Sequence, residues 1–440
     1  MLESKAGRLT AFTLLYISEG IPFGFSAIAL TTYLRQQGVG LTEIGAFTAS
    51  LYAPWAFKWA WAPLVDLVRL ERFGPKRAWI VFAQTMMILT MALVMVVDPG
   101  ANLHLLTLLI MLHNVFAATQ DVAIDALAVQ VLPPHERGIA NGFMFGGSYF
   151  GQTIGGSGAL FLAGAVGFQA TFPFVCGMLL LILLFVSLRL VEPVRAVAVD
   201  AARGTMSVMQ AIGADLRRFL RDLRDGLFRS GRGPLIGVFF AAIPGGALAL
   251  GLALSSTMQV DLGMTDNQIA TLNLYTSIVA AVGCVVGGWV SDRLGHRKML
   301  AVWYALTTLP TFYLSGQFTG ASGVEGITID SYFRVAIAYN FMSGLVQGTA
   351  LAVFMGLTSP LVAGTQFTGY MALKNFVYSY SSIWQGKYAD VAGYAATLRL
   401  DAIIGFLPIL VLPFLVPSTR GAAANPVADV LVPDPVPRPD

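Results

Sequence analysis

Charged side chains are scarce in this sequence of 440 residues: Asp, Glu, Lys and Arg together make up 12%, against about 25% in typical soluble domains. Hydrophobic residues rise to 56%. Such a chain has too few charges to cover a water-soluble surface, which argues against a soluble globular protein. The net charge of +3 indicates little by itself, and no nucleic-acid partner is suggested.

Cysteine and histidine are also rare, with two cysteines and four histidines. Cys176 and Cys284 lie inside apolar segments, where a thiol behaves as a small hydrophobe, so neither a disulfide framework nor a metal site is expected. The histidines are scattered and form neither a metal-ligand cluster nor a nucleophile–base pair; they are His104, His113, His135 and His296. We therefore expect no enzyme and no cofactor.

The sequence is instead rich in long apolar runs. At 1.5 Å per residue, about 20 helical residues cross a hydrocarbon core of roughly 30 Å. Twelve runs meet this length approximately, at 10–33, 42–66, 78–97, 103–131, 138–165, 169–190, 234–258, 267–290, 299–316, 332–356, 364–386 and 395–416. The pattern predicts an all-α integral membrane protein with twelve transmembrane helices, the first retained because no cleavage site follows it.

Lysine and arginine gather on one side of these predicted spans. They follow the second, fourth, sixth and eighth runs, whereas the opposite loops nearly lack them, with Arg35 the main exception. Because basic loops stay in the cytoplasm, we expect both termini to be cytoplasmic.

One long polar insertion separates the sixth run from the seventh. It divides the chain into an N-terminal half at 1–191, a linker at 192–233, a C-terminal half at 234–417 and a tail at 418–440. Apolar residues recur at helical spacing over 206–228, which predicts an amphipathic helix on the membrane surface, more plausibly a tether than a regulatory site. The tail is rich in Pro and lacks periodicity, so we expect disorder.

A Gly- and Arg-containing turn follows the eighth run, and a related turn follows the second. The first turn along the chain runs from Asp66 to Arg77, and the second comprises Gly288, Asp292, Arg293, Gly295 and Arg297. The second turn is similar to the loop signature of the major facilitator transporters. Two related turns at corresponding positions indicate an internal repeat, and we expect them to act as conformational gates rather than as cargo ligands.

Three further segments resemble one branch of that superfamily: 20–24, 57–66, and 120–126 leading to 132–138. They are similar to the peptide and acetyl-coenzyme A transporter branch, which contains the AmpG muropeptide permeases, acetyl-coenzyme A transporters and siderophore permeases. The resemblance implies the major facilitator fold, with two pseudo-symmetric six-helix halves, in a bacterial inner membrane.

The same resemblance implies a monomeric secondary active transporter that moves an organic solute by alternating access with protons. A muropeptide-like or other peptide-bearing solute is the first expectation, and a siderophore or acetyl-coenzyme A is the alternative. A channel and a non-transporting membrane receptor are rivals of another class, which saturable, gradient-dependent uptake would separate from a carrier.

Charges within the predicted spans point to function, because each costs about 2.5–3.5 kcal/mol at the bilayer centre. Glu19 precedes Gly20 and Pro22 in the first span, and Asp121 lies in the fourth. We expect these carboxylates to couple protons to transport. The alternative, a structural ion pair with Lys58, stays equally open.

Asp125, Glu136 and Arg137 lie at the expected cytoplasmic end of the fourth span and resemble a gate network. Seven glycines between positions 142 and 158 of the fifth span, with a stripe at 147, 151 and 155, suggest a surface on which the two halves slide.

Lys374 is the sole full charge that we place in the middle of the C-terminal half, and a cation there suits an anionic group on cargo. Lys58 is a second candidate cation for cargo. Neutral hydrogen bonds to cargo are expected from polar side chains in the fourth, tenth and eleventh spans, with helix–helix hydrogen bonding the alternative; they are Asn114, Gln120, Tyr339, Asn340, Gln347, Tyr370 and Tyr378.

Overall fold

The computed structural model describes residues 2–67, 73–97, 102–132, 137–192, 232–320, 323–357 and 363–415, with scattered positions between 210 and 224. Every regular element within them is helical, as predicted. Seven helical segments among these residues are long and apolar enough to cross a membrane. The linker helix predicted at 206–228 lies mostly outside the described residues, although its scattered described positions are helical, and the tail at 418–440 lies wholly outside them.

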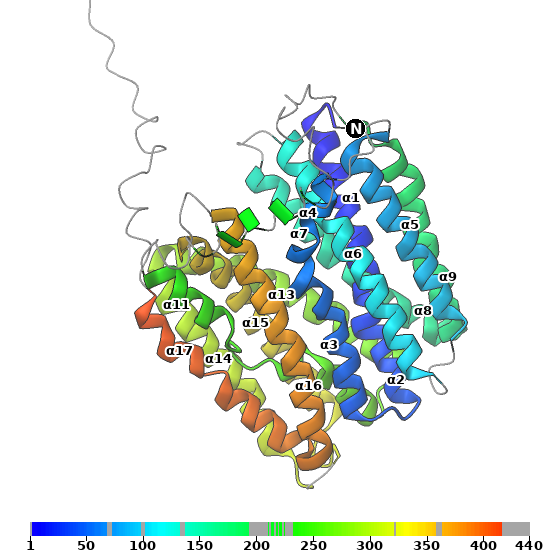
Figure 1. Ribbon diagram of the computed structural model, residues 1–440. Coiled ribbons are helices and arrows are strands. Elements are labelled where there is room, and N and C mark those ends of the chain that lie inside the picture. The colour runs from blue at the N-terminus through cyan, green and yellow to red at the C-terminus, as the bar shows by residue number, and fades with distance from the viewer. Residues whose placement is uncertain are drawn as a thin grey trace, which may run out of the picture.

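The N-terminal helices follow the predicted spans within a few residues (Figure 1). A π-helical turn at Phe25–Leu30 joins α1 (Lys5–Gly24) to α2 (Thr31–Gln36), and a 3-10 turn at Lys58–Ala60 joins α3 (Leu41–Phe57) to α4 (Ala62–Leu67). The next elements are α5 (Pro75–Met95), α6 (Leu103–Val131), α7 (Arg137–Thr153), α8 (Ala159–Val166) and α9 (Thr171–Phe185). A second π-helical turn, Ile154–Gly158, connects α7 to α8.

The C-terminal helices are α11 (Arg232–Ala241), α12 (Ala253–Asp261), α13 (Asp266–Leu294), α14 (His296–Gln317), α15 (Ile329–Leu357), α16 (Ala363–Ile404) and α17 (Leu407–Val411). The label α16 covers two helices that meet at Gly393, where a φ of 79° is not helical. The first of them contains the eleventh predicted span, and the second, with α17, contains most of the twelfth.

The span predicted at 234–258 is not one helix, which corrects the sequence analysis. It divides into α11 and α12, and the residues between them are irregular apart from a 3-10 turn at Ala249–Gly251. Pro244 has no N–H to continue the helix. Gly246 has a φ of 73°, a left-handed conformation that an L side chain rarely adopts. The hydrophobic run predicted one continuous helix, but its Pro and Gly residues break the helical backbone inside it.

Glycine allows α1 and α7 to pack backbone to backbone. A Cβ atom on Gly151 would lie 2.5 Å from the Ile17 carbonyl oxygen, and one on Gly155, in the π-helical turn after α7, would lie 1.8 Å from that of Ile21. The glycine stripe itself packs against α1 among the N-terminal helices, and the same predicted span also contacts α13 among the C-terminal helices. Its role as a sliding surface stays a prediction. Gly287 and Gly348 make an equivalent close contact between α13 and α15.

The N-terminal and C-terminal helices meet along α3 and α16, which run side by side in Figure 1. Gly45 and Gly386 permit this approach, because a Cβ on either would lie 2.4 Å from a carbonyl oxygen of the other helix. The end of α2 also contacts α12.

Candidate functional site

Lys58 and Asp121 form an ion pair inside the N-terminal helices. The Lys58 ammonium donates a hydrogen bond to the Asp121 carboxylate, and the two side chains are 22% and 7% exposed. Lys58 begins the 3-10 turn after α3, and this turn directs its side chain toward α6. The sequence predicted both residues as functional, and the structure brings them together.

Glu19 and Asp125 complete a cluster with this pair. Glu19 is 5% exposed, and its charged neighbours are Asp121, Asp125 and Lys58. The Glu19 Oε1 atom has no hydrogen-bond partner among the residues that the structure describes. Asp125 accepts a hydrogen bond of 2.6 Å from the hydroxyl of Tyr16, a partner that the sequence analysis missed.

The cluster therefore holds three carboxyl groups and one ammonium. With every group ionised it would carry a net charge of −2 in a largely buried setting, which is unfavourable. A proton taken up by one carboxyl relieves part of this excess charge and supplies a donor. The arrangement is suited to binding and releasing protons.

Gln120 and Asn114, on the same helix as Asp121, already form hydrogen bonds within the protein. The Gln120 amide donates to the Ser18 hydroxyl and to Gln84 at 3.3 and 3.4 Å, whereas its Oε1 lacks a partner among the described residues. The Asn114 amide donates to the Ile110 carbonyl of its own helix at 2.9 Å. Both side chains are buried, and neither lines a described pocket.

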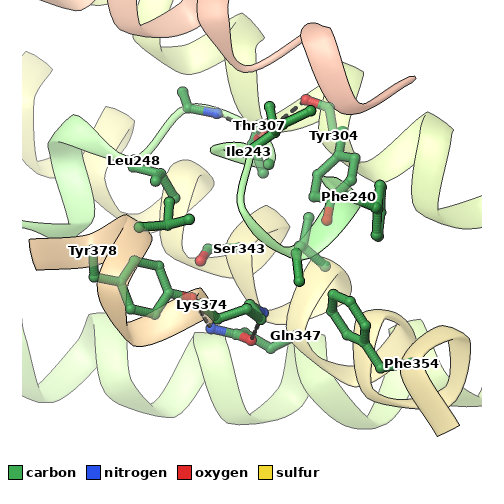
Figure 2. Close-up of a pocket in the computed structure, with 15 residues that line it drawn as sticks. Phe240, Ile243, Leu248, Tyr304, Thr307, Ser343, Gln347, Phe354, Lys374 and Tyr378 are labelled. Carbon is green, nitrogen blue, oxygen red and sulfur yellow. Dashed lines mark hydrogen bonds between the residues drawn. The ribbon is translucent and has the colours of Figure 1, made fainter. Parts of the chain in front are cut away.

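A pocket opens among the C-terminal helices (Figure 2). Its walls come from the end of α11, the irregular segment that follows it, α14, α15 and α16. The Lys374 ammonium lies 3.4 Å from Gln347 Oε1, and the Gln347 amide donates to the Tyr378 hydroxyl at 3.3 Å. Three predicted cargo ligands thus meet in one pocket.

Lys374 has no carboxylate within ion-pair distance among the described residues. Its ammonium also lies 5.8 Å from the centre of the Phe354 ring. A cation held by one long amide contact and a ring face retains donors for a further anionic partner.

The remaining predicted cargo ligands bond to backbone carbonyls. The Tyr339 hydroxyl donates to Ala247 at 2.9 Å, the Tyr370 hydroxyl to Pro234 at 3.1 Å, and the Asn340 amide to Ala336 at 2.9 Å. Tyr370 thereby holds Pro234 near the start of α11, and Tyr339 holds Ala247 in the irregular segment after it.

Asp401 is a buried charge in the last predicted span that the sequence analysis missed. It is 1% exposed, and its Oδ2 accepts from the N–H groups of Leu248 and Ala249 at 2.7 and 2.9 Å. Its Oδ1 accepts from the Gln385 amide at 2.8 Å. An acidic residue within the apolar run 395–416 was the available signal.

The first of the two predicted gate turns is only partly described. The side chains of Asp66 and Arg137, and all of Glu136, lie outside the described residues. The Arg77 guanidinium donates to the Leu188 carbonyl at 2.5 Å. Glu192 accepts from the backbone N–H groups of Lys76 and Arg77 at 3.0 and 3.3 Å and so caps α5.

The second turn joins α13 to α14 at Gly295, where φ is 96°. Asp292 and His296 lie 3.7 Å apart, and the Arg293 guanidinium stacks 3.8 Å from the centre of the Trp289 ring. A Cβ on Gly288 would lie 3.8 Å from the Gly348 carbonyl oxygen, and Arg297 lies in the first turn of α14. The side-chain contacts described above for Asp292 and Arg293 lie within the turn itself.

Known proteins are similar to this chain in sequence and in fold. Residues 12–243 match the family model described as Major Facilitator Superfamily. The chain is 25% identical to "Putative transporter AmpG 4" of Rickettsia conorii, over 93% of this chain and 97% of that protein. It is 23% identical to the "Anhydromuropeptide permease" of Escherichia coli K12, over 92% of this chain and 79% of that protein.

Solved structures share the fold. A D-xylose-proton symporter has a TM-score of 0.69 at 14% identity, covering 94% of this chain and 99% of that one. A mutant of the nucleoside transporter NupG has a TM-score of 0.66 at 13% identity, covering 93% of this chain and 99% of that one. With more than half of the sequence matched by the family model and a long-helix architecture of the same kind, the chain belongs to the Major Facilitator Superfamily.

Proposed function

We propose that this protein is a proton-coupled importer of an anionic, muropeptide-like solute in a bacterial inner membrane. The observation that carries the proposal is the Lys374 pocket, where an ammonium without a carboxylate partner among the described residues lies beside Gln347 and Tyr378. Similarity to the anhydromuropeptide permease over most of both chains supports the choice of cargo.

The pocket has a cavity volume of about 40 Å³, so it has room for one polar group of such a cargo, and its side chains match such a group chemically. A peptide-bearing sugar has a carboxylate, which an ammonium binds by a charge-assisted hydrogen bond. It also has hydroxyl and amide groups, which Ser343, Gln347 and Tyr378 can meet. The ring of Phe354 offers an apolar face.

Alternating access then requires two units that rock about the site. We assign α1–α9 and α11–α17 to two six-helix halves, with the cytoplasmic termini and basic loops predicted from the sequence. Contacts within each group, such as α1 with α7 and α13 with α15, support this division, and α3 with α16 forms part of the moving interface.

The coupling proton is assigned to the Glu19 and Asp121 carboxyl groups. The unpartnered Glu19 Oε1 supports this assignment, because a protonated carboxyl there gains a donor while it removes excess negative charge. Lys58 holds Asp121 in place and balances one charge of the cluster.

Uptake into proteoliposomes tests the proposal. Purified protein is offered anhydromuropeptide and, in parallel, a ferric siderophore, with and without an inward proton gradient. We expect accumulation of anhydromuropeptide only with the gradient. Siderophore accumulation instead would reassign the cargo, and saturable uptake that ignores the gradient would contradict proton coupling.

A further inference from the structure

The Lys374 pocket depends on a wall that is not a regular helix. Between α11 and α12 the chain leaves the helical path, and Ile243, Gly245, Ala247 and Leu248 face the pocket. Irregular backbone within a membrane-spanning segment is stable only where neighbouring groups satisfy its N–H and C=O groups. The contacts that hold this segment therefore determine the shape of the pocket.

Asp401 makes the strongest of these contacts. Its carboxylate accepts two backbone N–H groups at the point where the chain starts to turn back into helical structure, at Leu248 and Ala249. Hydrogen bonds to an ionised acceptor are about twice as strong as neutral ones. No Lys, Arg or His among the described residues pairs with Asp401. The hydrogen bonds from these two N–H groups and from the Gln385 amide therefore stabilise its negative charge.

Weaker contacts hold the rest of the segment. The Gly246 N–H donates to the Gly405 carbonyl at 3.1 Å, and the Ala247 N–H donates to the Thr307 hydroxyl at 3.3 Å. Gly405 lies so close to the segment that a Cβ there would be 2.5 Å from the carbonyl carbon of Gly246. Asp401 and Gly405, four residues apart, thus place one end of α16 directly behind the pocket wall.

We propose that Asp401 is a positioning residue for cargo binding. Its carboxylate fixes the irregular segment between α11 and α12, so that the pocket presents Lys374 and the facing backbone in the geometry that receives an anionic solute. This role rests on the proposed function for its cargo, but the positioning of the segment by Asp401 is independent of which solute is carried.

Hydrogen–deuterium exchange of the purified full-length protein tests the positioning directly. In Asp401→Ala we expect the amides of residues 242–251 to exchange at least tenfold faster, because two N–H groups lose an ionised acceptor. In Asp401→Asn we expect exchange within about threefold of wild type. An Asn Oδ1 still accepts, and Gln385, whose Oε1 has no partner among the described residues, can turn to accept from the Asn amide.

Transport of anhydromuropeptide in proteoliposomes gives the second readout. We expect Asp401→Ala to raise KM about tenfold with Vmax changed less than threefold, and Asp401→Asn to restore KM to within threefold. Lys374→Met should raise KM as well, but leave the exchange of 242–251 unchanged. Asp330→Asn, at a position whose side chain is 79% exposed, is the control and should change neither readout.

Unchanged exchange in Asp401→Ala, or a lower Vmax at unchanged KM, would overturn the proposal. If Asp401→Ala does not fold, Gln385→Met removes only the third hydrogen bond of the carboxylate. Exchange of 242–251 should then rise about threefold, and an unaltered rate would contradict the proposal. If wild-type protein fails to accumulate anhydromuropeptide, the proposed cargo is wrong, while the exchange results still decide the role of Asp401.

Discussion

Arg35 holds Asp261 by two hydrogen bonds of 2.6 Å each, which join the end of α2 to α12 across the two helix groups. The Tyr394 hydroxyl donates to the same carboxylate at 2.7 Å. Arg35 was the exception to the basic-loop pattern in the sequence, and its partner accounts for it. The Arg35 guanidinium donates to both oxygens of the Asp261 carboxylate. We call this ion pair the latch, because it joins the two helix groups at the end that we propose to face the periplasm.

Breaking the latch should open that end of the bundle. In Arg35→Ala, Asp261 loses its cation, and we expect the two helix ends to separate in a larger fraction of molecules. Spin labels at positions 37 and 267, in a background without Cys176 and Cys284, report the separation as a second, longer distance. Arg334→Ala, at an exposed pair on one helix, serves as the control. Identical distance distributions in wild type and Arg35→Ala would refute the latch.

Glu19→Gln should uncouple transport from the proton gradient. The amide keeps the shape of the side chain but cannot take up a proton, so we expect gradient-driven accumulation of anhydromuropeptide to fall at least tenfold. Exchange of labelled for unlabelled solute across the membrane, which needs no net proton movement, should persist within threefold. Asp121→Asn should lower both rates, because it leaves the buried Lys58 ammonium without its carboxylate partner. If Glu19→Gln accumulates anhydromuropeptide as wild type does, Glu19 is not needed for proton coupling, and the cluster is a structural ion pair.

Lys374→Met should weaken cargo binding. The substitution retains the apolar stem and removes the ammonium, and loss of a charge-assisted hydrogen bond to an anion raises KM by about tenfold. Lys387→Met, at an exposed position on the same helix, is the matched control. Equal KM values in concentration-dependent uptake for Lys374→Met and wild type would exclude Lys374 as the cargo cation.

Gly151→Ala should destabilise the protein. Its new Cβ would meet the Ile17 carbonyl oxygen at 2.5 Å, so α1 and α7 must move apart, at a cost of about 1–3 kcal/mol. Gly146→Ala, on the same helix, meets nothing within 4 Å and should be neutral or stabilising by up to about 1 kcal/mol. Thermal unfolding in detergent compares the two. A lower unfolding temperature for Gly146→Ala than for Gly151→Ala would contradict this packing.

The local sequence determined the membrane class of this protein and most of its helices. A run such as 103–131 cannot remain in water and satisfies its own backbone hydrogen bonds as a helix, so α6 begins and ends where its hydrophobicity does. Side-chain chemistry also indicated which residues to examine. A buried Glu19, Asp121 or Lys374 is costly wherever it lies, and the sequence shows this without any coordinates.

The tertiary structure decided which of these residues meet and what each one contacts. The hydrophobicity of a segment does not specify which other segment it contacts. The pairing of Arg35 with Asp261 and of Tyr16 with Asp125 therefore depends on the packing of distant helices. The glycine stripe on α7 was visible in the sequence, but only packing showed that α1 is its partner. Pro244 and Gly246 allowed a break, whereas Asp401, more than 150 residues away in the chain, stabilises it. Long-range hydrogen bonds between helices, rather than the composition of any one helix, shape the pocket that contains Lys374.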